Sequence, residues 1–193
     1  MDLVELIAKR RSIRKFENRE VEEGKIAKLI DFARLCQSAK NRQPWRFMIL
    51  KGEDKNSIAD IMLSIFEKKI DLPKVANSSK AGAKIIRNAP VLIMVFREQN
   101  DQDLNWFTGD MLSIGAAIEH ICLGSVELGL GSVWIRDTVY ADELIINHLQ
   151  LKGYELVSSI AVGYAAETPI PRPRKAIDEI IINPCDRAGG LKD

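Results

Sequence analysis

The sequence contains few of the residues on which metal binding and nucleophilic catalysis depend. It has only two histidines and three cysteines, and no Cys-x-x-Cys pair that would indicate a zinc site or a dithiol redox motif. We expect His120, in an apolar stretch, and His148, near a helix end, to be structural, because neither has the neighbours that a general base needs. We therefore predict no bound metal and no catalytic side chain. The cysteines are Cys36, Cys122 and Cys185.

The glycine-rich and hydrolase fingerprints are missing as well. No P-loop, Gly-x-Gly-x-x-Gly, Gly-x-Ser-x-Gly or His-Glu-x-x-His motif occurs. Gly129-Leu130-Gly131 follows an expected helix rather than a strand, so it does not predict a dinucleotide site.

Features of secreted, membrane-spanning or nucleic-acid-binding proteins are also scarce. The first residues are acidic and amphipathic, unlike a secretory leader. The longest apolar stretch, around residues 111–130, is interrupted by polar side chains, which predicts a buried helix rather than a membrane span. A net charge of +1 gives no reason to expect nucleic acid as a partner. We expect one cytoplasmic domain over residues 1–193.

Helical and strand patterns alternate along the chain, which predicts a layered α/β or α+β domain. The run 90–96 is apolar on both faces and should be a central strand, and the stretch 105–128 should be a central helix. The other helices are expected at about 2–9, 22–35, 54–69, 141–149 and a short one ending at 87. The other strands are expected at 45–50, 132–135, 157–164 and 179–182, with loops at 72–79 and 101–105 and an extended, proline-rich segment at 168–174.

Arginine is concentrated at two places in this nearly neutral chain. Residues 10–15 hold three arginines, a lysine and a serine, and residues 171–175 read Pro-Arg-Pro-Arg-Lys. In an extended segment, Arg172 and Arg174 point to the same side. The planar guanidinium suits a phosphate, because it gives paired, charge-assisted hydrogen bonds. The alternative is that both runs are solvated surface. Neither run has the aromatic platforms of a nucleic-acid-binding face.

A polar loop, Ser-Ala-Lys-Asn-Arg-Gln-Pro-Trp at residues 38–45, precedes the first expected strand. Its amide and hydroxyl groups are able to hydrogen-bond the edge of a planar heterocycle. Considered alone, the loop is better interpreted as an ordinary turn between a helix and a strand.

Taken together and in this order, these segments resemble the FMN-dependent nitroreductase family. The similar motifs are R-R-S-I-R-K-F from residue 10, S-A-x-N-x-Q-P-W-R-F from residue 38, G-L-G-S-V-W-I from residue 129, A-V-G-Y-A-A-E-x-P from residue 161 and P-R-P-R-K from residue 171. The resemblance spans nearly the whole chain. It implies an α+β fold with a central, mostly antiparallel sheet flanked by helices, and a homodimer that exchanges its C-terminal segment.

The resemblance also implies a set of FMN-binding residues. Arg10, Arg11 and Ser12 would hold the phosphate and ribityl chain, and Arg14 would lie near the N1/O2 edge of the flavin. Arg172 and Arg174 would complete the phosphate clamp. Gln37, Ser38, Ala39 and Asn41 would reach the flavin from the other subunit. The stretch 132–137, with Trp134, Ile135 and Arg136, would pass its N5 side, and Lys84 is a further candidate contact.

The implied function is an FMN-dependent oxidoreductase that takes a hydride from NAD(P)H and reduces a nitroaromatic, quinone or related small-molecule acceptor by a ping-pong cycle. Flavin supplies such chemistry itself, in keeping with the scarcity of histidine. The chain departs from many members at Cys36-Gln37-Ser38, where they have Ala-Pro-Ser. It departs again at Arg136-Asp137, where they have Gly or Glu-Gly near N5.

Two alternatives remain open at this stage. One is a flavin-binding or redox-sensing protein with little turnover. The other is a flavin enzyme of the same fold with other chemistry, such as reductive dehalogenation or flavin destruction. Relatives of the second kind place a lid over the flavin, a role for which residues 70–79 are candidates.

Overall fold

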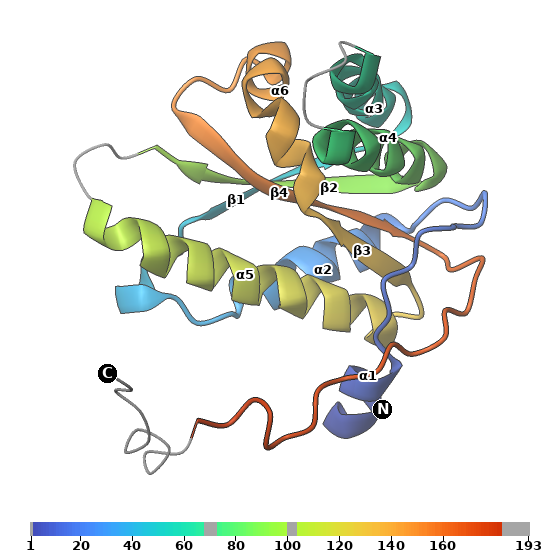
Figure 1. The fold of residues 1–193 in the computed structure, drawn as a ribbon, viewed down its shortest axis with the longest axis vertical. Coiled ribbons are helices and arrows are strands. Elements are labelled where there is room, and N and C mark those ends of the chain that lie inside the picture. Colours follow the sequence, from blue (N-terminus) through green and yellow to red (C-terminus); the bar gives the residue numbers. More distant parts are fainter. Residues whose placement is uncertain (1, 68–72, 100–103, 183–193) are drawn as a thin grey trace, which may run out of the picture.

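Four strands form one antiparallel sheet between two layers of helices in the computed structural model (Figure 1). The structure describes residues 2–67, 73–99 and 104–182. The strand order is β1-β2-β4-β3, and this arrangement confirms the α+β class with a mostly antiparallel sheet. The strands are β1 (Trp45–Leu50), β2 (Val91–Glu98), β3 (Gly131–Ile135) and β4 (Tyr154–Gly163).

Strand β2 lies in the middle of the sheet, as its apolar sequence predicts. Its side chains alternate between two cores, one on each face of the sheet. Leu92, Met94 and Phe96 pack into one core, and Val91, Ile93 and Val95 pack into the other. The register pairs Leu50 with Leu92 and Ile93 with Ile160, so burial on both faces fixes the strand alignment.

One layer contains α3 (Gly52–Glu67), α4 (Pro73–Asn88) and α6 (Asp142–Leu149), the last preceded by the 3-10 helix η2 (Arg136–Ala141). The loop predicted at 72–79 is wrong from residue 73 onward, because α4 begins at Pro73. Proline is well tolerated in the first helical turn, and the turn-like Asn-Ser-Ser at 77–79 lies inside the helix. The helix buries one face at Ala76, Ser79, Ala83 and Ile86.

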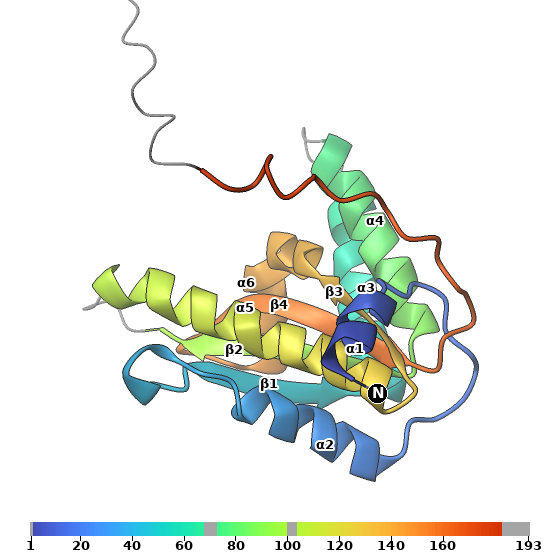
Figure 2. The same ribbon diagram turned by 90° about the horizontal axis from the view of Figure 1, so that it is seen from below.

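The other layer contains α2 (Glu23–Arg34) and α5 (Leu104–Glu127), which pack against each other beneath the sheet in Figure 1 and face the viewer in Figure 2. The long helix α5 buries Ile114, Ile118 and Ile121 completely, so it is central as predicted. Leu112 on the same helix is 71% exposed. Among the described residues, no helix has the length and apolar character needed to cross a membrane.

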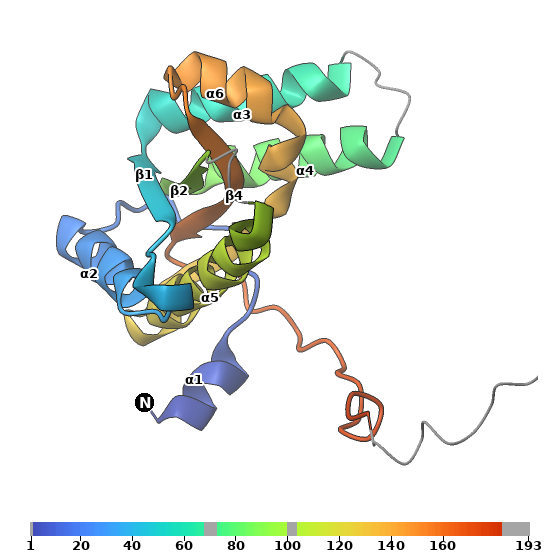
Figure 3. The ribbon, with the colours of Figure 1, turned by 90° about the vertical axis from the view of Figure 1, so that its left-hand side faces the viewer.

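Both ends of the chain leave the layered body (Figure 3). Helix α1 (Leu3–Lys9) contacts α5 but buries no residue fully. After β4 the chain is irregular, and the proline-rich segment 168–174 is extended as predicted. The strand predicted at 179–182 is wrong, because this segment turns on itself through a hydrogen bond from Ile180 N–H to the Ile177 carbonyl and lies away from any sheet edge. Cys185 and residues 101–103 of the loop predicted at 101–105 lie outside the described residues, and the rest of that prediction is wrong because α5 begins at Leu104.

Candidate functional site

The two arginine clusters, which come from opposite ends of the sequence, line one cleft of about 550 Å³. Among the residues that the structure describes, no aspartate or glutamate lines it. The polar lining consists of Arg10, Arg11, Ser12, Arg14, Arg172 and Arg174, and the rest comprises Ile7, Ala8, Pro169, Ile170 and Pro171. The fold thus brings together six of the predicted FMN-binding residues, five of them arginines, around one cleft.

The first cluster is held in place by the edge strand β3. Ile13 N–H donates to the Ser132 carbonyl at 2.9 Å, and Ser12 forms a short parallel bridge to the same residue. Ile13 is buried against Gly131, where a β-carbon would lie only 2.7 Å from its side chain. Only glycine allows this close approach. Ile13 therefore points into the core and leaves its neighbours facing the cleft.

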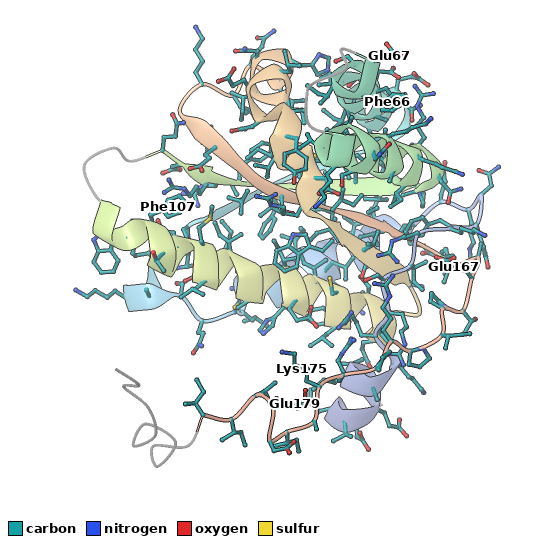
Figure 4. All side chains as sticks on the ribbon, viewed as in Figure 1. Phe66, Glu67, Phe107, Glu167, Lys175 and Glu179 are labelled. Atoms are coloured by element: carbon teal, nitrogen blue, oxygen red, sulfur yellow. The ribbon has the colours of Figure 1, made fainter. Side chains whose placement is uncertain are left out.

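The second cluster is brought alongside the first by a short pairing of backbones. Glu17 N–H donates to the Tyr164 carbonyl at 2.9 Å, and Ala166 N–H donates to the Lys15 carbonyl at 3.0 Å. Glu167 adds its carboxylate, whose Oε1 accepts from Arg14 N–H at 2.6 Å and from Lys15 N–H at 3.1 Å (Figure 4). The proline-rich segment then continues from this anchor along the cleft.

Most guanidinium groups in the cleft are hydrogen-bonded to neutral carbonyls rather than to carboxylates. Arg11 donates to the carbonyls of Ala8 and Arg10, and Arg14 donates to that of Ser12. Arg10 is the exception, since its buried Nε is 3.4 Å from Glu119 Oε1, close enough for an ion pair but without hydrogen-bond geometry. The cleft therefore carries uncompensated positive charge and a buried N–H without an acceptor, a donor set that fits a phosphate.

The predicted residues at the end of β3 lie outside the lining of this cleft. Trp134 is 43% exposed and donates its indole N–H to Ser158 Oγ. The Ile135 side chain is buried, and its carbonyl accepts hydroxyl hydrogen bonds from Thr138, Ser158 and Ser159.

Beyond Ile135, the exposed Arg136 donates to the Tyr140 hydroxyl at 3.1 Å and stacks on that ring. Lys84 is exposed on α4 and is not part of the lining either.

The predicted loop residues 37–41 lie against α5 instead. Gln37, Ser38 and Ala39 line a separate cleft of about 320 Å³ together with Gly109, Leu112, Ser113 and Ala116. Within the polar loop at residues 38–45, φ is positive at Lys40, Asn41 and Gln43. This conformation costs non-glycine residues about 1–2 kcal/mol each. Within one chain, the structure does not bring this loop into the cationic cleft.

Among the residues that the structure describes, the remaining titratable groups do not gather into a catalytic or metal-binding cluster. His120 Nδ1 is 3.0 Å from the Phe32 carbonyl, and His148 Nε2 is 2.9 Å from Ser57 Oγ. Burial raises the pKa of the Cys122 thiol to about 11, so it is protonated at neutral pH. In the described part of the chain, no group of three or more His, Cys, Asp or Glu residues could hold a metal ion.

Two carboxylates with clear roles in this geometry were missed from the sequence. Glu167 lies within the A-V-G-Y-A-A-E-x-P motif, but only the fold reveals that it accepts from backbone amides of the first cluster. Asp110 lies on the apolar helix α5. An aspartate within such an apolar sequence indicates a buried acid that needs a charged partner, and this signal was available from the sequence. It pairs with Arg42 from the loop at 3.1 Å.

The chain is similar to known proteins over most of its length. The sequence model of the Nitroreductase family matches residues 7–164. A putative NADH dehydrogenase/NAD(P)H nitroreductase of Methanothermobacter thermautotrophicus is 31% identical over 88% of this chain and 80% of the relative. Iodotyrosine deiodinase 1 of Sus scrofa is 27% identical over 94% of this chain and 68% of the relative.

Solved structures have the same fold. A BluB-like flavoprotein from Clostridium difficile 630 superposes with a TM-score of 0.77 at 29% identity, over 95% of this chain and 99% of that one. A putative nitroreductase in complex with FMN from Desulfovibrio desulfuricans also gives a TM-score of 0.77, at 22% identity, over 95% of this chain and 96% of that one.

Proposed function

This chain belongs to the nitroreductase family, and on that basis we propose that it is an FMN-dependent oxidoreductase that uses NAD(P)H to reduce a second small-molecule acceptor. The observation that carries the proposal is the cationic cleft, which collects arginines from both ends of the chain. FMN ends in a single phosphate, and a concentrated group of guanidiniums without lining carboxylates suits such a dianion.

The donor set of the cleft fits the flavin phosphate. Arg10 offers a buried N–H that lacks a hydrogen-bond partner, and Ser12 adds a hydroxyl close to the end of α1. Arg172 and Arg174 are exposed on the opposite wall, on a segment stiffened by prolines, so little conformational entropy is lost when they bind. We assign the phosphate to these four residues and to Arg11.

Arg14 extends the cleft beyond the phosphate group. Its side chain is exposed, and its backbone is fixed by Glu167. A cation at this position would stabilise negative charge on the N1/O2 edge of the flavin ring. When bound, FMN supplies the hydride transfer from NAD(P)H to the acceptor in a ping-pong cycle, and the protein contributes binding, orientation and charge.

The proposed enzyme acts as a homodimer. The loop 37–41 and the cationic cleft lie apart in one chain, so a partner subunit would have to bring the loop to the flavin. Exposed apolar side chains available for contact with a partner include Leu3 and Ile7 on α1 and Leu112 on α5. An exchanged C-terminal segment would add Ile177 and the three isoleucines at 180–182.

The proposal is tested by purifying the protein and measuring NADH and NADPH oxidation with menadione or a nitroaromatic as acceptor. Bound FMN and steady turnover with a double-reciprocal pattern of parallel lines would support it. Bound FMN without turnover would favour a flavin-binding or redox-sensing protein, and a protein that neither contains nor takes up FMN would refute the proposal.

Similarity to iodotyrosine deiodinase 1 favours reductive dehalogenation as a second candidate function. Of the candidate lid at residues 70–79, residues 73–79 belong to the helix α4, which packs on α3 beside the sheet. The direct test is release of iodide from iodotyrosine by the reduced, FMN-loaded protein under anaerobic conditions. Iodide release would establish this activity, and its absence alongside nitroaromatic turnover would favour the first candidate.

A further inference from the structure

At its N-terminal end, α5 presents a stripe of side chains to the loop at residues 38–43. Trp106, Asp110 and Ser113 are spaced by four and three residues, so they share one face of the helix. Ala39 N–H lies 3.4 Å from Ser113 Oγ, while Lys40 and Arg42 stack over the Trp106 ring at 5.0 and 4.7 Å. Phe107 marks this end of the helix in Figure 4.

Asp110 is the buried centre of this contact. Its side chain is 7% exposed, and its Oδ1 and Oδ2 accept from Arg42 Nε at 3.1 Å and Nη2 at 3.4 Å. Arg97 approaches it from β2 at 4.0 Å and is itself paired with Glu155 at 2.7 Å. The four charges balance. The Arg97–Glu155 pair joins two strands of the sheet, and the Asp110–Arg42 pair extends the network out to the loop.

The loop needs such an anchor because its backbone is held in an unfavourable conformation. Lys40, Asn41 and Gln43 have φ values of +48°, +55° and +49°, and none of them is glycine. Left-handed backbone at non-glycine residues persists only where the surrounding structure determines it, and it is concentrated at functional sites. Ser38 Oγ, which accepts from Gln43 N–H at 3.0 Å, closes the loop but does not tie it to the body of the molecule.

We propose that Asp110 is the positioning residue for the flavin-contacting loop: through Arg42 it fixes residues 38–43 in the conformation in which they reach the flavin held by the partner subunit. The inference rests on the proposed function, since it requires FMN and a dimer. Asp110 itself does not touch the flavin. It acts on FMN binding through Arg42 and the loop, at a site whose phosphate-binding arginines belong to the partner subunit.

The first test measures FMN affinity by titrating apoprotein, with and without the substitution Asp110→Asn. The asparagine keeps the shape but removes the charge, so the loop should lose its fixed conformation. We expect FMN to bind roughly tenfold more weakly, because a hydrogen bond that the loop no longer presents to the flavin is worth about that factor in affinity. Arg42→Gln removes the same link from the exposed loop side and should give the same loss of affinity. It keeps the inference testable should Asp110→Asn fail to fold.

The matched control is Asp31→Asn, which removes the carboxylate of an exposed Asp31–Arg34 pair on α2. This variant should retain wild-type FMN affinity. The double variant Asp110→Asn/Arg42→Gln should be no weaker than either single variant, because both substitutions break one link.

The decisive test uses a heterodimer of an Arg10→Ala/Arg172→Ala subunit and an Asp110→Asn subunit, purified through two different tags. If the loop acts on the partner's flavin, one site combines an intact clamp with an intact loop, and half of the sites bind FMN with wild-type affinity. If the loop acts within its own chain, each site carries one defect and no wild-type binding phase remains.

Absence of that phase, or wild-type affinity in both the Asp110→Asn and Arg42→Gln homodimers, would overturn the inference and leave the proposed FMN-dependent oxidoreductase activity intact. A wild-type protein that binds no FMN, or that is a monomer, would overturn both together.

Discussion

The molecule contains two arginine-rich regions that treat positive charge in opposite ways. Around Asp110, the guanidiniums of Arg42 and Arg97 are matched by two carboxylates and fix pieces of the fold to one another. In the cationic cleft, five arginines face one another without a lining acid. Arg10 pairs with Glu119 from outside the lining at 3.4 Å, and the hydrogen bonds of Arg11 and Arg14 go to carbonyls. Paired charges stabilise the fold around Asp110, whereas the excess positive charge of the cleft suits an anionic ligand. The net charge of +1 for the whole chain does not reveal this difference.

The strongest challenge to this comparison is to remove the uncompensated charge. In the variant Arg10→Ala/Arg172→Ala we expect FMN to be lost during gel filtration. Two charge-assisted hydrogen bonds contribute about 3–6 kcal/mol together, or roughly 10²- to 10⁴-fold in affinity. The thermal midpoint should change little, because the loss of the partly exposed Arg10–Glu119 pair is offset by weaker repulsion among the remaining like charges. The control Arg34→Ala, which removes an exposed and paired arginine, should retain the flavin. Full FMN retention in the double variant would remove the basis for assigning the phosphate to the cleft.

The compensated region should show the reverse behaviour. Asp110→Ala removes the carboxylate that Arg42 and Arg97 share, although Arg97 keeps Glu155 and Arg42 is partly exposed, so we expect about 1–3 kcal/mol of destabilisation. Urea unfolding followed by circular dichroism measures this loss, with Arg172→Ala as the variant that should unfold like the wild type. Equal stability of the two variants would mean that pairing does not distinguish the regions.

Glu167 is a carboxylate beside the cationic cleft that does not neutralise an arginine side chain there. It accepts hydrogen bonds from the backbone amides of Arg14 and Lys15 instead. Glu167→Ala should weaken FMN binding about tenfold. The backbone at Arg14 and Lys15 loses the hydrogen bonds that orient the first arginine cluster toward Arg172 and Arg174, and one charge-assisted hydrogen bond is worth ~1.5–3 kcal/mol. Glu167→Gln retains an oxygen acceptor and should have a smaller effect. An alanine variant with unchanged FMN affinity, measured by flavin fluorescence quenching, would show that the anchor is dispensable.

Asp142 offers a case of carboxylate burial without a matching arginine. Burial raises its pKa above the ordinary value, with the neighbouring Glu155 and Glu143 acting in the same direction, while Leu156 N–H donates to it. The folded state therefore holds the proton more tightly than the unfolded state, and stability falls as pH rises from the ordinary pKa through the raised one.

Asp142→Asn should remove this dependence and make the protein slightly more stable at neutral pH, as urea midpoints at pH 4 and pH 7 would show. A variant that is less stable than the wild type at pH 7 would contradict the assigned direction.

The sequence carried much of the fold because the responsible signals are local. The apolar run of β2 and the helical periodicity of α5 predict central elements, and both are central. The predicted bounds of helices and strands were wrong where packing outweighed the local sequence signal. The polar residues at 77–79 suggest a loop, but α4 continues through them because Ala76 and Ala83 bury one face on either side. The isoleucines at 180–182 have strand propensity but no strand edge to join.

The site was predictable to the extent that residue type alone indicates chemistry. Clustered arginines at 10–14 and 172–174 predict an anion site, and the fold places them in one cleft. Glu167 and Asp110 act through particular hydrogen bonds to a distant backbone and a distant loop, and no local pattern encodes such partners. The role of the loop 37–41 depends on a second subunit and stays a prediction.

The central claim is that the cationic cleft binds the phosphate of a flavin, and the most direct measurement compares the affinities of the apoprotein for FMN and riboflavin, which differ only by that phosphate. We predict that the wild type binds FMN at least about a hundredfold more tightly, and that this ratio falls close to one in Arg10→Ala/Arg172→Ala. A ratio near one in the wild type, or an unchanged ratio in the variant, would contradict the assignment.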